Sequence, residues 1–268
     1  MKLYISADIE GVCGVTSWSE TDLLNHESHQ FIAEWTKEIQ AVVYTALEMG
    51  FRQIYIKDAH DTGRNLKHES FPPETKLIRG WSGHPYGMVE GIEKGFDAAV
   101  FVGYHSKAGS NTNPISHTLF PKKVRTIKIN GEIASEFLIY YYACAYEKVP
   151  VVLVTGDKGL CKDVNRINPY ISTVATKEGF GGATINYSPI EVCKQIKAQT
   201  KIALDNNVKN PIVLPQTFDI ELVFVKHADA YRASFYKGAS AFEDGFTVKY
   251  RTKDYFDVLR FLSFVISE

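Results

Sequence analysis

The stretch that decides the predicted fold is residues 2–11, KLYISADIEG. Its first part, Leu3–Ala7, is an apolar and β-branched run, which predicts a buried strand. Two carboxylates, Asp8 and Glu10, follow the strand directly. A buried strand that ends in acidic side chains is typical of an α/β protein whose site lies at the carboxyl edge of its sheet.

The succession of strand and helix repeats along the chain. Residues 27–49 carry apolar side chains at helical spacing, and Gly50 is placed to end that helix. A second helix is predicted over 136–146. Further strands are predicted over 53–57, 98–104 and 151–155. Strands that alternate with helices predict a three-layer α/β/α fold with a mostly parallel sheet.

The second half of the chain departs from this pattern. Asn130-Gly131 predicts a two-residue hairpin that leaves the main sheet, because both positions of a type I′ turn need positive φ. A helix over 188–206 is followed by strands over 217–226 and 246–251 and by a helix from Asp254. We therefore predict a metal-binding catalytic α/β domain over 1–206 and a smaller α+β subdomain over 207–268, with a single domain as the alternative.

The composition is that of an ordinary globular protein. Of the 268 residues, 45% are hydrophobic and 23% are charged, which excludes a disordered chain. The formal net charge of -1 gives no basic surplus for nucleic acid or an anionic membrane, so we expect a small-molecule partner. No apolar run approaches the roughly 20 residues of a membrane span. Four cysteines without CxxC spacing favour a reducing compartment, and we expect the cytoplasm.

Titratable side chains follow each predicted strand of the main sheet. They are Asp8 and Glu10 after the first strand, Asp58 and His60 after the second, His105 after the third and Asp157 after the fourth. The carboxyl ends of parallel strands meet at one edge of a sheet, so we expect these side chains to gather there. This shared placement, rather than any one residue, indicates a site.

A metal ion explains this set best. Asp8 and Glu10, two apart in extended chain, face the same side and would repel each other without a cation. Carboxylates and imidazoles without thiolates suit Zn, Mn, Co or Fe in a hydrolytic site, and so many ligands allow two ions. Such a pair activates a bridging water and polarises a carbonyl group. An acidic residue after a strand also often caps a helix, which remains an alternative for Asp8 and Asp157.

Other polar and glycine-rich positions receive no catalytic role. Asp58 is expected to support the site from behind, and Cys13 is expected to pack in its loop. We interpret Gly179–Gly182 as a turn from strand to helix, because it lacks the glycine fingerprint and the lysine of phosphate-binding loops. Solvated or structural roles are expected for the remaining histidines, His26, His29, His68, His84 and His227.

Five elements, in order and spacing, carry a family resemblance. They are Ser6-Ala7-Asp8-Ile9-Glu10-Gly11, Asp58-Ala59-His60, Gly103-Tyr104-His105, Ser116-His117 and Val154-Thr155-Gly156-Asp157. Together they resemble the zinc-dependent D-aminopeptidases of the DppA type, and the resemblance runs along nearly the whole chain.

The resemblance implies a binuclear centre with two zinc ions per subunit. Asp8 would bridge the ions, Glu10 and His60 would complete one site, and His105 and Glu136 would complete the other. Glu136 is preferred to Glu132 because it opens the helix after the hairpin, as the family pattern requires. The family often has glycine before this glutamate, where this sequence has Ser135, so the local backbone freedom differs.

The resemblance also implies a catalytic residue and an assembly. His117 matches the family's catalytic histidine, close to the metals but not bound to them. As a neutral imidazole it would act as a base or assist the nucleophile, and as an imidazolium it would stabilise an oxyanion or protonate the leaving amine. Family members are self-compartmentalising, so a ring-shaped homo-oligomer is implied, with a decamer as one candidate size.

We therefore predict a hydrolase, a metallo-aminopeptidase that releases N-terminal D-amino acids from small D-peptides or amides. One alternative keeps the metal centre but acts on L-peptides or another small amide, because stereochemical preference depends on pocket shape. A second alternative is a non-catalytic peptide-binding accessory of dipeptide uptake. Hydrolysis of paired D and L substrates separates these readings.

Overall fold

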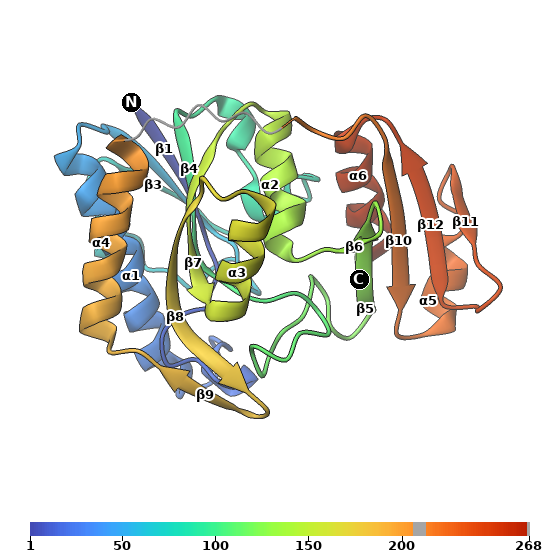
Figure 1. The fold of residues 1–268 in the computed structure, drawn as a ribbon, viewed down its shortest axis with the longest axis horizontal. Helices are drawn as coiled ribbons and strands as arrows, with labels where there is room; N and C mark the ends of the chain where they lie inside the picture. The colour runs from blue at the N-terminus through green and yellow to red at the C-terminus, as the bar shows by residue number, and fades with distance from the viewer. Residues whose placement is uncertain (206–212, 267–268) are drawn as a thin grey trace.

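The computed structural model describes residues 1–205 and 213–266, which form two β-sheets and the helices that cover them (Figure 1). The larger sheet lies in the N-terminal part of the chain. The smaller sheet stands beside it and is drawn mainly in orange and red, the colours of the C-terminal residues.

The larger sheet has seven strands in the order β3-β2-β1-β4-β7-β8-β9. Neighbouring strands are parallel, except that β9 runs antiparallel to β8. The strands are β1 (Lys2–Ala7), β2 (Gln53–Asp58), β3 (Thr75–Ile78), β4 (Ala98–Tyr104), β7 (Val151–Asp157), β8 (Ser172–Phe180) and β9 (Ala183–Asn186). The predicted mostly parallel sheet and its four predicted strands are confirmed.

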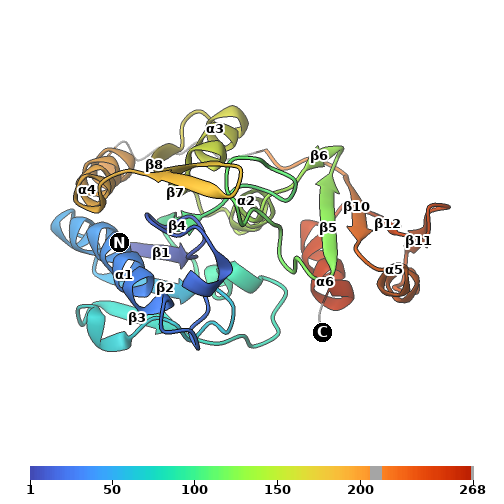
Figure 2. The same ribbon diagram turned by 90° about the horizontal axis from the view of Figure 1, so that it is seen from below.

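Helices cover both faces of this sheet, as Figure 2 shows. Their bounds are α1 (Ser28–Glu48), α2 (Glu136–Tyr146), α3 (Lys158–Ile167) and α4 (Pro189–Asp205). Alternate side chains of β1 separate the two faces, because Leu3 and Ile5 pack in the buried cluster with α1 and α4 whereas Tyr4 packs in the cluster with α2. The three-layer α/β/α prediction is therefore confirmed. Gly50 ends α1 with φ +91°, which favours glycine.

The smaller sheet has the strand order β11-β12-β10-β5-β6. Its elements are β5 (Val124–Ile129), β6 (Glu132–Ile133), β10 (Phe218–Phe224), β11 (Ala239–Ala241), β12 (Thr247–Thr252), α5 (His227–Ala233) and α6 (Tyr255–Ile266). Asn130 and Gly131 have φ of 52° and 82°, as the predicted hairpin requires. The hairpin joins strands from the C-terminal part of the chain, so the second sheet draws on both sides of the predicted boundary. That boundary, between 206 and 207, lies outside the described residues, and the division into domains stays a prediction.

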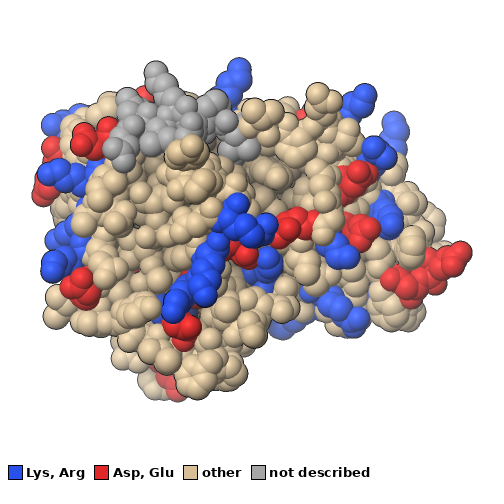
Figure 3. Space-filling view, viewed as in Figure 1, with Lys and Arg blue, Asp and Glu red and all other residues tan. Residues whose placement is uncertain are grey.

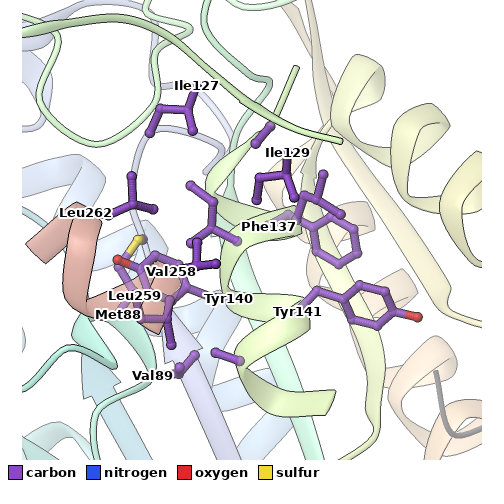
Figure 4. Close-up of a cluster of buried hydrophobic side chains, with 14 of the residues drawn as sticks. Met88, Val89, Ile127, Ile129, Phe137, Tyr140, Tyr141, Val258, Leu259 and Leu262 are labelled. Atoms are coloured by element: carbon purple, nitrogen blue, oxygen red, sulfur yellow. The ribbon is translucent and has the colours of Figure 1, made fainter. Parts of the chain in front are cut away.

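One buried apolar cluster joins the two sheets. Figure 4 shows Ile127 and Ile129 of β5 in one cluster with Phe137 of α2 and with Val258 and Leu262 of α6. The same cluster continues through Phe101 on β4 into the larger sheet. The smaller sheet is thus packed against the larger one through α2, which carries Glu136 at its first position.

The glycine-rich stretch after β8 differs from its prediction. Gly181, with φ +55°, turns the chain between two antiparallel strands, β8 and β9, and not from a strand into a helix. The strand β9 was missed because its four residues are mostly exposed and carry no run of buried apolar side chains.

The visible face of the molecule carries charges of both signs. On the face in Figure 3, acidic and basic side chains are interspersed among neutral ones. Among the described residues, no helix is both long and apolar enough to cross a membrane.

Candidate metal centre

Six titratable side chains converge at the carboxyl edge of the larger sheet. They are Asp8 and Glu10 after β1, His60 after β2, His105 after β4, His117 in the loop before β5 and Glu136 at the start of α2. All six are buried, with exposed fractions between 1% and 8%. The predicted gathering of strand-end residues therefore occurs, and it includes the two residues that only the family resemblance indicated.

Three glycines allow the chain to come this close. A Cβ atom at Gly11 would lie 1.7 Å from the backbone oxygen of Tyr104, and one at Gly156 would lie 1.9 Å from the same oxygen. A Cβ atom at Gly103 would lie 2.1 Å from the backbone oxygen of Asp8. These distances are far below van der Waals contact, so only glycine lets the three strand ends meet.

The first group of donor atoms comes from Asp8, Glu10 and His60. The Nδ1 atom of His60 lies 3.1 Å from Oε2 of Glu10 and 3.5 Å from Oδ1 of Asp8. One ligand atom from each of the three residues lies within 4.8 Å of the others. This is a donor set of two oxygens and one nitrogen, of the kind that holds zinc.

The second group comes from His105, Glu136 and His117, which also offer ligand atoms within 4.8 Å of one another. The Nε2 atom of His105 lies 3.2 Å from Oε2 of Glu136 and 3.5 Å from Oδ2 of Asp8. The two carboxylate oxygens of Asp8 thus face different groups. The Nε2 atom of His117 lies 3.5 Å from Oε1 of Glu136 and 4.0 Å from Oε1 of Glu10. His117 is therefore near enough to be a ligand as well as a catalytic group.

Each histidine of the centre is oriented by a backbone carbonyl. The Nε2 atom of His60 lies 2.9 Å from the oxygen of Thr21, and the Nδ1 atom of His105 lies 3.0 Å from the oxygen of Ser106. The Nδ1 atom of His117 lies 3.0 Å from the oxygen of Ile115. A carbonyl oxygen accepts a hydrogen, so the neutral ring carries its proton on that side and presents a lone pair to the centre.

A buried polar network supports the loops of the centre. Asp157 accepts hydrogen bonds from the backbone of Ser106 at 2.7 Å and from that of Leu160 at 2.9 Å, so it caps α3 and fixes the chain after His105. Asn113 donates to Asp157 and to the carbonyl oxygen of Glu10. Asp157 therefore caps a helix, which is the alternative role that the sequence analysis kept for it.

Two further residues hold the loops from behind. Lys177 is buried and donates to the carbonyl oxygen of Glu10 at 2.6 Å. Asp58 accepts from the backbone of Asn65 at 2.6 Å and of Leu66 at 2.8 Å, and so fixes the loop after His60. Asp58 thus lies behind the centre, where it was expected. Lys177 was not singled out from the sequence, since a lysine in a strand carries no local sign that it is buried.

The electrostatics of the centre reflect its burial and its mixed charges. Burial, together with the carboxylate of Glu10, raises the pKa of Asp8 well above its usual value. Burial opposes the ionisation of Glu10, but the imidazoles around it, His60 first, hold its pKa well below the usual value. Burial opposes the charging of His105, yet the carboxylate of Glu136 raises the pKa of His105 to about 10. The protein alone thus balances its buried carboxylates with protonated imidazoles.

A cation fits this donor set better than protons do. Three atoms of the centre, Oδ2 of Asp8, Oε2 of Glu10 and Nε2 of His105, are buried and have no hydrogen-bond partner among the described residues. An unsatisfied buried polar atom costs about 1–3 kcal/mol, and more when it is charged. The donor set and its unpartnered atoms fit a centre of one or two zinc ions.

The positions that were given no ligand role make other contacts or are exposed. Glu132 is on the surface and pairs with Arg166. Cys13 is buried in its loop, where its backbone donates to Glu38 and its thiol to the carbonyl oxygen of Tyr187. Ser135 caps α2, with its hydroxyl accepting from the backbone of Leu138 at 3.2 Å, a contact that glycine would lack. The five remaining histidines are exposed, namely His26, His29, His68, His84 and His227.

Comparison with known proteins identifies the family. A family model described as D-aminopeptidase matches residues 1–264. The D-aminopeptidase of Bacillus subtilis (strain 168) is 30% identical over 258 residues, which cover 95% of this chain and 92% of that protein. A solved structure, the Zn-dependent D-aminopeptidase DppA from Bacillus subtilis, described as a self-compartmentalizing protease, superposes with a TM-score of 0.92 at 28% identity over 99% of this chain and 97% of that chain. The chain belongs to the D-aminopeptidase family.

Proposed function

We propose that this protein is a metal-dependent aminopeptidase that releases N-terminal D-amino acids from small D-peptides or amides through a binuclear zinc centre. The observation that carries the proposal is the position of Asp8, whose two carboxylate oxygens face His60 and His105 at 3.5 Å each. A carboxylate shared in this way suits two ions side by side. Family membership supports the reaction, and the Zn-dependent relative supports the metal.

We assign the two sites residue by residue. Glu10 and His60 would hold one ion, His105 and Glu136 the other, and Asp8 both. When bound, the ions would polarise the scissile carbonyl group and lower the pKa of a water molecule.

His117 would then move the proton. Its Nδ1 atom is directed at the carbonyl oxygen of Ile115, so the neutral ring has its lone pair on Nε2, which faces the centre. Burial and the neighbouring imidazole of His105 lower the pKa of His117, which favours the neutral base. Nε2 would accept a proton from the nucleophile and return it to the leaving amine.

Side-by-side hydrolysis of D-Ala-D-Ala and L-Ala-L-Ala by zinc-loaded protein tests this function, with a chelated sample as control. Cleavage of the D form alone, lost on chelation, is expected. Preference for the L form would keep a metallopeptidase and refute the stereochemistry. Absence of cleavage of either peptide would refute the peptidase reading.

The variant His117→Ala tests the role of that residue. It is expected to fold and to keep its zinc while turnover falls by about a hundredfold or more, in the range typical of a lost general base. Loss of zinc from this variant would show that His117 is a ligand, which its distance from Glu136 allows.

We further propose a homo-oligomeric ring in the cytoplasm. The description of the relative as self-compartmentalizing supports the ring, as do the exposed apolar side chains of Phe180 and Ile185 on the β8–β9 hairpin. The four cysteines are free, which supports a reducing compartment. Light scattering coupled to gel filtration tests the assembly, and a monomeric mass would refute it.

A further inference from the structure

Trp18 lies against His117, one of the six residues of the centre. Its indole ring contacts the imidazole of His117 edge to face, with ring centroids 5.0 Å apart and planes at 65°. His117 is the most exposed of the six residues of the centre, at 8%. A substrate that reaches the centre along His117 therefore passes the ring of Trp18.

The short helix that carries Trp18, η1 (Trp18–Glu20), is fixed to the centre and to the sheet. Thr21 directly follows it, and the carbonyl oxygen of Thr21 is the partner of His60. The carboxylate of Glu20 accepts from the backbone of Thr16 at 2.5 Å and of Ser17 at 2.9 Å. The hydroxyl of Thr16 bonds to that of Thr184 on β9 at 2.6 Å. The backbone that carries Trp18 is thus held in place by contacts on both sides.

The fold does not account for the indole itself. Trp18 belongs to neither of the two buried apolar clusters of the described residues, and 46% of its surface is exposed. A half-exposed tryptophan beside buried polar groups offers a large, rigid apolar surface at little cost in conformational entropy.

We propose that Trp18 is a specificity-determining residue whose indole packs against an apolar side chain that flanks the scissile bond. This inference rests on the proposed function and names its substrate class, which is small peptides with a bulky apolar residue next to the cleaved bond. The contact with His117 places the indole beside the reacting group. A bulky apolar side chain is expected to raise kcat/KM by about tenfold over alanine, in the range of hydrophobic pockets.

The kinetic test compares D-Ala-D-Ala with D-Leu-D-Ala and D-Ala-D-Leu on zinc-loaded protein. The wild type is expected to prefer one leucine peptide about tenfold, mainly through KM, and Trp18→Ala is expected to lose that preference. Trp81→Ala is the matched control, since Trp81 is 42% exposed and packs on Lys57 instead of the centre. Its substrate ratios should equal those of the wild type. Equal ratios in the wild type and Trp18→Ala would overturn the proposal.

Fluorescence gives a second readout that does not depend on turnover. The chain has three tryptophans, and Trp35 is buried, so Trp18 is the one exposed tryptophan left in Trp81→Phe. Saturating D-leucine is expected to shift the emission of that zinc-loaded variant, and the shift should vanish when Trp18→Phe is added. An unchanged emission would count against the contact.

The two readouts separate the possible failures. If the wild type cleaves no peptide, the proposed function fails, and the emission shift still decides whether Trp18 contacts the ligand. Zinc content and the unfolding midpoint of Trp18→Ala should match those of the wild type. A loss of either would show that Trp18 is structural and would overturn the proposal.

Discussion

Glu38 should make the stability of this protein depend on pH. Its side chain lies on α1 and is fully buried. One carboxylate oxygen accepts the backbone N–H of Cys13 at 3.0 Å, and the other has no hydrogen-bond partner among the described residues. Burial, reinforced by the nearby carboxylate of Glu34, raises the pKa of Glu38 from 4.5 to about 8. At neutral pH the folded protein therefore holds this carboxyl group protonated.

The sign and the size of the effect follow from linkage. Between pH 4.5 and about 8 the unfolded chain has released this proton and the folded chain has kept it. The free energy of unfolding therefore falls as pH rises through that window. The contribution is fully present below pH 4.5 and is lost above about 8. At about 1.4 kcal/mol per pKa unit, the loss between pH 5 and pH 8 is about 3–4 kcal/mol.

The variant Glu38→Gln isolates this contribution, because glutamine keeps the oxygen that accepts from Cys13 and cannot ionise. Urea unfolding of both proteins at pH 5 and pH 8, with the same chelator in every sample, gives the difference in pH dependence. Glu48→Gln is the matched control, an exposed glutamate at the end of the same helix. The wild type should lose about 3–4 kcal/mol more than Glu38→Gln between these pH values. Equal losses would refute the reasoning.

Three other predictions address the centre and its scaffold. Asp8→Asn should lower both zinc content and turnover by at least about a hundredfold. Normal turnover with stoichiometric zinc would contradict the assignment of Asp8 as a ligand. Zinc binding at pH 7 should release protons, because the carboxylates around His60 and His105 outweigh the effect of burial and raise both imidazole pKa values. Calorimetry in two buffers of different ionisation enthalpy measures this release, and its absence would contradict the assigned ligands. Gly11→Ala should cost about 3 kcal/mol or more, since its Cβ atom would lie 1.7 Å from a backbone oxygen. Gly182→Ala, with no atom within 4 Å of its Cβ, should leave the free energy of unfolding nearly unchanged.

The placement of the four site residues that follow strands was predictable from local patterns. Apolar runs mark the strands, parallel strands end at one edge, and Asp8, Glu10, His60 and His105 each follow a strand. Glu136 follows no strand of the larger sheet, and His117 lies in a loop. Nothing local brings these two to the edge, and only the resemblance to a known family indicated them.

Long-range pairing explains most of what the sequence did not predict. Ile127 on β5 pairs with Leu222 on β10, so the predicted hairpin and the predicted C-terminal strands share one sheet. The local pattern predicts each strand, but it does not predict which other strand it pairs with. In the same way, the contacts of Trp18 with His117 and of Lys177 with Glu10 join residues far apart in the chain.

The position of Glu136 links the metal supply to the lifetime of the protein. Glu136 begins α2 three residues after the end of β6, so it belongs to the segment that leaves the smaller sheet, whereas Asp8 and His105 belong to the larger one. An ion held by all three would cross-link the strand ends of the larger sheet to α2, the helix on which the smaller sheet packs. If the ion binds only the folded state, it would raise the free energy of unfolding, and the increase would grow with the logarithm of the free zinc concentration. Zinc-starved cells would then hold less of this protein, because the uncross-linked chain opens more often to proteases.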